Sequence, residues 1–150
     1  MAQWFECKVR YDKTMEDGKI KKVTEVYLVD ALSFTEAERR FLEEITPFMS
    51  GDFEVSDIKK AKIAELAESN DGNADRWFRC KVAFITLDEK TGAEKRTTQT
   101  ILVQAIDLRD AVKNLDKLMS GTLGDYVIVS VAESPIIDIF RYVQKPETEE

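Results

Sequence analysis

The hexapeptide WFECKV at residues 4–9 returns as WFRCKV at residues 77–82, and each copy contains one of the chain's two cysteines. The match extends beyond these letters. With an offset of 73 or 74 residues, the Leu-Val pair at 28–29 aligns with 102–103, and an Asp-aromatic pair further along aligns in the same way. Three blocks in the same order indicate that a unit of about seventy residues is written twice.

Each copy predicts the same series of elements. The hexapeptides begin strands rich in aromatic and β-branched residues. A polar, glycine-containing connection then leads to a second strand, at about 22–32 or 97–106. A helix follows, with Ser33 as N-cap and Glu36 three residues on in the first copy, and Asp107 as N-cap in the second. Helical spacing predicts the buried stripes: Phe34, Ala37, Phe41 and Ile45, and Leu108, Ala111, Leu115 and Leu118.

The last segment of each copy is less regular. IIDIFRYV, in the second copy, is typical of a strand, whereas KKAKIAELAE in the first has the Ala, Lys, Glu and Leu content of a helix. Because a duplicated unit is expected to keep its element types, we interpret both segments as extended and bent. Residues 59–67 remain open to either structure.

These patterns predict an α+β fold. Two β-β-α-β-(β) repeats are expected to share one largely antiparallel sheet, with both helices on one face. The repeats span about 3–68 and 76–143, a polar linker covers 69–75, and residues 144–150 form a frayed acidic tail. A copy of about seventy residues would bury only a marginal core if it folded alone, so we expect residues 1–150 to form a single domain.

Composition excludes several classes of protein and function. The chain has 150 residues, with 43% hydrophobic and 34% charged side chains, as in a soluble globular domain. It contains no apolar run near the roughly 20 residues of a membrane helix and no signal-peptide pattern, so we expect a cytoplasmic protein. The net charge of −7 disfavours binding to nucleic acid. The absence of histidine removes a common proton-transfer residue and metal ligand.

The two cysteines fall on the strand face that is expected to be buried. Alternate side chains of a strand share a face, so Cys7 lies with Phe5 and Val9, and Cys80 has equivalent neighbours. A free cysteine in such surroundings behaves as a small hydrophobic residue. A zinc site would need further ligands that the sequence does not supply, so we expect no metal and no cofactor.

The opposite strand face contains the candidate ligand-binding residues. There a tryptophan alternates with long charged side chains, which can stack a ring or a base while a cation meets a phosphate or carboxylate. Two other interpretations stay open. Each tryptophan is covered by the last strand of its copy, or the pair marks a seam or a homodimer contact. The candidate residues are Trp4, Lys8, Trp77, Arg79 and Lys81.

Four segments together resemble a bacterial family catalogued only as a domain of unknown function: WFECKVRYDKT, VTEVYLVDALSFTEAE, GDFEVSDIKKAK and RWFRCKVAFITLDEKTGAEK. The likeness covers nearly the whole chain. Members of that family are short, single-domain proteins regarded as cytoplasmic. The resemblance therefore implies a self-contained domain, and it brings no activity, cofactor, partner or site residue with it.

Three hypotheses about function follow. The first is a small non-enzymatic protein that binds a protein partner or a small ligand on a sheet face, and it nominates no catalytic residue. The second is a nucleic-acid-associated protein that uses the tryptophans and the basic strand residues in spite of the net charge. The third is an enzyme of unknown class that uses Cys80 as its reactive group.

Overall fold

The structure is a computed structural model that describes residues 3–141. The predicted acidic tail at 144–150 lies outside the described residues. The described chain divides into two compact units, one formed by residues 3–61 with 136–141 and the other by residues 62–135. The second unit is thus inserted in the sequence between two parts of the first.

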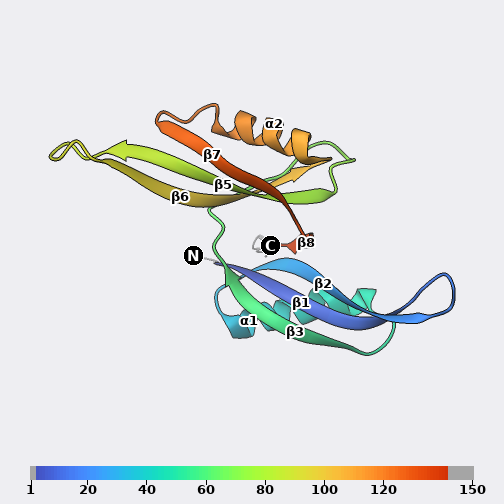
Figure 1. Ribbon diagram of the computed structural model, residues 1–150. Helices are drawn as coiled ribbons and strands as arrows, with labels where there is room; N and C mark the ends of the chain where they lie inside the picture. The colour runs from blue at the N-terminus through green and yellow to red at the C-terminus, as the bar shows by residue number, and fades with distance from the viewer. Residues whose placement is uncertain (1–2, 142–150) are drawn as a thin grey trace, which may run out of the picture. The chain divides into compact units, whose positions relative to one another are not determined.

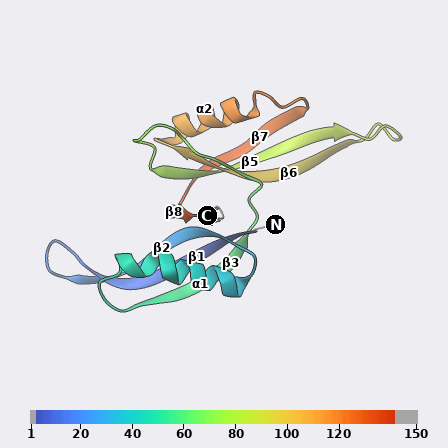
Figure 2. The same ribbon diagram turned by 180° about the vertical axis from the view of Figure 1, so that it is seen from behind.

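The first unit is a four-stranded sheet with a helix on one face (Figure 1). Its strands lie in the order β3-β1-β2-β8, where β1 is antiparallel to both β3 and β2, and β8 runs parallel to β2. Figure 2 shows the helix α1 lying along the sheet. The elements are β1 (Gln3–Thr14), β2 (Ile20–Ala31), α1 (Phe34–Ile45), the 3-10 helix η1 (Thr46–Phe48), β3 (Phe53–Ala61) and β8 (Ile136–Phe140).

The second unit has the same kind of sheet and helix. Its strand order is β4-β6-β5-β7, with β4 parallel to β6 and the other pairs antiparallel. The helix α2 packs against the face that holds the unit's core. The elements are β4 (Glu65–Ala67), β5 (Arg76–Leu87), β6 (Glu94–Ala105), α2 (Leu108–Met119) and β7 (Asp125–Ser134).

The α+β class is confirmed, but the expectation of one shared sheet is wrong, because the strands form two separate sheets. Residues 59–67 are extended apart from a short break after Ala61. After β3 and β7 the chain passes to the other sheet. The pairing of β3 with β1 ends at Ala61, and the pairing of β7 with β5 ends at Ser134. Pro135, the next residue, has no N–H with which to continue the ladder between β7 and β5. The segments beyond these breaks form β4 and β8, beside β6 and β2.

Both units repeat the order β-β-α-β, whereas the predicted repeat boundaries, 3–68 and 76–143, do not coincide with the compact units. Residues 142 and 143 lie outside the described part of the chain. Descent of the two units from one duplicated sequence remains an interpretation, and a single domain over 1–150 remains a prediction.

The helix N-termini form as the sequence predicts. Ser33 Oγ accepts a hydrogen bond from the Glu36 N–H at 3.1 Å, and Asp107 Oδ1 accepts one from the Asp110 N–H at 2.8 Å. The carboxylates of Glu36 and Asp110 in turn accept bonds from the backbone N–H groups that precede the caps. Each helix therefore begins with the N–H of its third residue satisfied by a side-chain cap, and the carboxylate of that third residue in turn accepts a bond from the N–H of the residue before the cap.

The predicted buried stripes are correct at Ala37, Phe41 and Ile45 and at Ala111 and Leu115, and they are wrong at their first residues, Phe34 and Leu108. The buried residues are Ala37, Phe41 and Ile45 in α1, and Ala111, Leu115 and Met119 in α2, a spacing of four in both helices. Phe34 and Leu108, each the first residue of its helix, are 49% and 50% exposed. Met119 rather than Leu118 continues the spacing of four, and Leu118 is only partly buried.

Candidate functional site

In the first unit, the predicted residues Trp4 and Lys8 lie on the face of β1 that points away from α1. Both side chains are half-buried. Between them, Glu6 is 8% exposed, and its carboxylate Oε2 lies 3.5 Å from Lys59 Nζ on β3. The predicted combination of a tryptophan and a cation on one strand face is therefore present here, with Arg10 next along the same face.

In the second unit, the predicted residues Trp77, Arg79 and Lys81 lie on the corresponding face of β5. Trp77 is 5% exposed, Arg79 is half-buried and Lys81 is exposed. The ring of Trp77 presents little surface to a ligand, so a stacking role would need its neighbours to move. The binding role of these five residues stays a prediction.

The two cysteines are buried among core residues, as predicted. Both side chains are 0% exposed. Burial raises the pKa of the Cys80 thiol from its ordinary value of 9.0 to about 11. Burial, followed by the charges of Asp57, Glu38 and Glu6, raises the pKa of Cys7 to about 12. Each thiol is protonated at neutral pH and shielded from solvent, which are poor conditions for the nucleophile that the enzyme hypothesis requires of Cys80.

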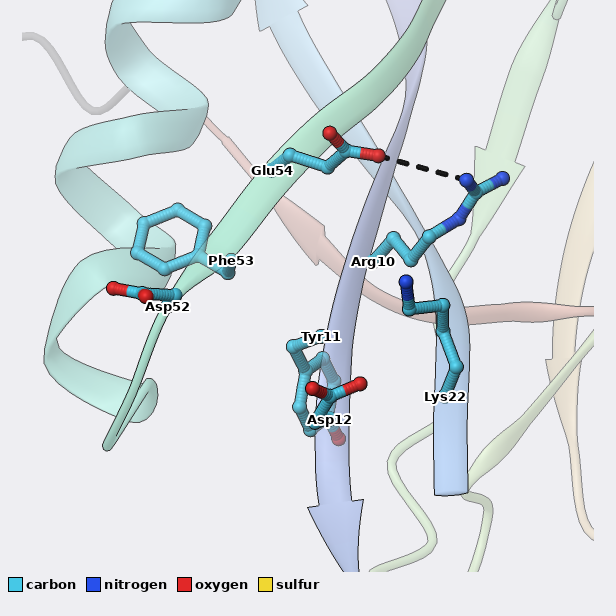
Figure 3. Close-up of a pocket in the computed structure, with 7 residues that line it drawn as sticks. All are labelled: Arg10, Tyr11, Asp12, Lys22, Asp52, Phe53 and Glu54. Atoms are coloured by element: carbon cyan, nitrogen blue, oxygen red, sulfur yellow. Dashed lines mark ion pairs between the residues drawn. The ribbon is translucent and has the colours of Figure 1, made fainter. Parts of the chain in front are cut away.

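A charged pocket lies at the end of the first unit's sheet, near the tip of the β1–β2 hairpin (Figure 3). Its volume is about 250 Å³. In Figure 3, Arg10 and Lys22 lie on one side and Asp52 and Phe53 on the other, with Asp12 between them. The residues that line this pocket, called the Arg10 pocket below, are Arg10, Tyr11, Asp12, Lys22, Asp52, Phe53 and Glu54.

Strand register brings these charges together. Arg10 on β1 is paired with Glu54 on β3, and Asp12 on β1 is paired with Lys22 on β2. Because residues paired across a ladder share a sheet face, all four side chains belong to the face away from α1. Arg10 Nη1 lies 3.5 Å from Glu54 Oε1, and both side chains are largely exposed, at 45% and 65%. This ion pair therefore adds little to stability.

The aromatic residues of the Arg10 pocket belong to the other sheet face. Tyr11 is paired with Phe53, and Phe53 packs against the core under α1. The pKa of Tyr11 is raised, first by burial and then by the Glu25 carboxylate, so its hydroxyl stays protonated and can donate a hydrogen bond. The pocket thus combines two cations, three carboxylates and the edges of two rings.

The second unit lacks this combination of charges. By the same strand pairing, Arg10 corresponds to Ala83, Asp12 to Ile85 and Glu54 to Val127. Only the charges of Lys22 and Asp52 have counterparts there, in Arg96 and Asp125. The Arg10 pocket was not among the sequence-predicted sites. A position-by-position comparison of the two copies for charge could have found it.

The fold and the pocket define a small α+β protein with two helix-covered, largely antiparallel sheets and an open charged site on one of them. The chain belongs to the family described as a domain of unknown function, DUF4494, whose model matches residues 3–142. The family resemblance inferred from the sequence is therefore confirmed, and no activity is known for it. No curated protein matches the chain.

Residues 3–141 contain neither of two further features. In that range, no group of three or more Cys, Asp or Glu side chains is placed to hold a metal ion. No helix in the same range has the length and apolar character needed to cross a membrane.

Proposed function

We propose that the protein is a small non-enzymatic binding protein whose ligand occupies the Arg10 pocket. The observation on which the proposal rests is the clustering of five charged side chains of both signs around one pocket, three of them at positions that are apolar in the other unit. Exposed strand ends tolerate apolar or polar residues alike, so the fold itself does not require this cluster.

The arrangement of charges favours a small zwitterion. A ligand carboxylate can meet Arg10 and Lys22, while a ligand ammonium group can meet Asp12 or Asp52 across the pocket. The volume of about 250 Å³ is below the roughly 300 Å³ at which pockets for drug-sized molecules begin. A free amino acid or a dipeptide end has the charges and the size that this pocket accepts.

The lining residues support binding rather than catalysis. No cysteine, serine or threonine lines the pocket, and the chain has no histidine. Tyr11 holds its proton more tightly than usual. The pocket is open to solvent, so its charges are screened.

The proposal is tested by ¹⁵N NMR titration with three probes of similar size that differ mainly in charge: glycylglycine, N-acetylglycine and glycylglycinamide. We expect glycylglycine to shift the amide signals of residues 10–12 and 52–54 more strongly than either singly charged probe. Lys22→Gln is expected to weaken the response, whereas Arg96→Gln, at the matched position of the second unit, leaves it unchanged. Equal responses to all three probes, or an unaltered response in Lys22→Gln, would refute the proposal.

A further inference from the structure

A second hollow lies in the first unit between the start of α1 and β3, on a surface distinct from the Arg10 pocket. Its volume is about 330 Å³, and it is called the α1–β3 groove below. Phe34 and Glu38 line it from α1, and Val55, Asp57 and Ile58 line it from β3. β3 is the end strand of its sheet, so its outer backbone edge has no strand partner within residues 3–141.

The groove has an apolar surface that continues the core. Phe34 is 49% exposed, while its ring meets the buried ring of Phe5 edge to face, with centroids 5.0 Å apart. Val55 and Ile58 are partly buried and pack against the same core. A half-exposed aromatic ring held by the core is the kind of contact on which partner side chains gain binding energy.

The groove is also acidic. Glu38 and Asp57 line it, no basic residue does, and neither carboxylate forms an ion pair within residues 3–141. Both carboxylates help to raise the pKa of the buried Cys7 beneath them, which shows that their charges act on the same region. Lys60, outside the lining, has its Nζ 6.0 Å from the centroid of the Phe34 ring.

The second unit again provides a comparison. The positions of Glu38 and Asp57 correspond to Val112 and Ser130, while Phe34 corresponds to Leu108. The apolar character is thus common to both units, and the acidic character belongs to the first alone. Charge therefore favours a basic occupant for the α1–β3 groove.

The shape of β3 limits how a partner can pair with it. The β1–β3 register shifts between Lys8 and Val9, which leaves Ser56 as an extra, unpaired residue on β3. Such a bulge bends an edge strand and hinders long edge-to-edge pairing, so a second copy of the sheet is disfavoured. A short segment can still pair with the regular stretch from Asp57 to Ala61.

We propose that the α1–β3 groove binds a short, extended, basic segment of a partner protein, which adds as a strand to the edge of β3. Adjacent side chains in that segment face opposite sides of the sheet, and side chains two residues apart share a side. On the α1 side, an apolar residue rests on Phe34 and Ile58, and a Lys or Arg two positions away reaches Glu38. On the opposite side, which Asp57 shares with its β1 partner Lys8, a neighbouring Lys or Arg reaches Asp57. This binding is independent of the proposed occupancy of the Arg10 pocket.

Fluorescence anisotropy tests the proposal with a labelled eight-residue peptide of Lys and Val that carries lysines on both faces of the extended chain, and with a Glu-Val peptide of the same pattern as the opposite-charge control. We expect the Lys-Val peptide to bind and the Glu-Val peptide not to bind. Glu38→Gln and Asp57→Asn each weaken binding by about two- to fivefold, the range of an exposed ion pair. Phe34→Leu, which introduces the residue of the matched position Leu108, is expected to weaken binding as well.

The control for general attraction to an acidic protein is Glu43→Gln, which removes an exposed charge from α1 outside the groove. We expect this variant to bind the Lys-Val peptide as the unaltered protein does. Hydrogen exchange should also slow at the amides of residues 57–61 when the peptide is bound. Equal weakening by Glu43→Gln and Glu38→Gln, or unchanged exchange at 57–61, would overturn the proposal, because attraction by net charge alone would then explain the binding.

Discussion

Cys7 and Cys80 occupy the same place in two strands, and each is packed between a phenylalanine and a valine of its own strand. Cys80 Sγ donates a long hydrogen bond of 3.8 Å to the Phe78 carbonyl oxygen, which is a weak interaction at most. The thiols therefore act as small apolar groups. Burial also determines how they respond to alkali.

Alkaline pH is expected to destabilise the fold through these thiols. Their pKa values are raised by folding, so the stability they confer is fully present below pH 9.0 and is lost as the pH rises toward about 11 for Cys80 and about 12 for Cys7. The loss is at most about 1.4 kcal/mol per thiol for each pH unit above 9. Folding raises the pKa values of Tyr11 and Tyr27 as well, which acts in the same direction from pH 10.0 upward.

Urea unfolding at about pH 8 and about pH 10.5 measures this effect. We expect a lower midpoint at the higher pH and a smaller decrease in a Cys7→Ala, Cys80→Ala double variant, whose tyrosines provide the remaining loss. Iodoacetamide should label neither cysteine quickly in the folded protein and both in urea. Rapid labelling at neutral pH without urea would show that the thiols are accessible, contrary to this account.

At the scale of elements, both helices begin with a side-chain cap and bury three residues spaced by four. Removal of the Ser33 or Asp107 cap by substitution with Ala should cost about 1 kcal/mol each. The loss at Asp107 should be the larger, because its negative charge also favours the helix N-terminus. The check is the free energy of unfolding in urea, with Ser50→Ala, in the loop before β3, as the matched control. A Ser33→Ala loss no greater than that of Ser50→Ala would contradict the capping role.

Local signals were enough to predict most of these elements. The strands, hairpins and helix caps follow from patterns within about ten residues, and alternation placed Cys7 and Cys80 correctly. The separation into two sheets was not predictable in this way, because the pairing of β8 with β2 joins residues more than a hundred positions apart. Periodicity says which residues are buried and not which strand lies beside them.

The Arg10 pocket escaped prediction for a related reason. Its charges come from three strands and from Asp52 just before β3, and they lie near one another because Arg10 pairs with Glu54 and Asp12 with Lys22. None of these residues stands out within its own strand, since charged residues at strand ends are common. The predicted Trp and Lys positions needed only the parity of one strand, which is why the sequence could place them on a common face.

At the scale of the whole molecule, one unit is formed by a continuous segment of the chain and the other by two segments that are far apart in the sequence. The unit at 62–135 is continuous, whereas the first unit needs β8 from the end of the described chain to complete its sheet. Phe140 on β8 stacks on Tyr27 of β2, with centroids 5.2 Å apart and planes 9° from parallel, and it also lies near Phe41 of α1. The C-terminal strand thus contributes to the core of the N-terminal unit.

Hydrogen exchange on the full chain and on a chain that ends at Pro135 tests this claim most directly. Removal of β8 should expose the edge of β2, so the amides of residues 26–29 are expected to lose protection, although the cut lies more than a hundred residues away. The β5 and β6 amides of the continuous unit, 62–135, should keep theirs. Unchanged protection of residues 26–29 in the shortened chain would contradict the assignment of β8 to the first unit's sheet.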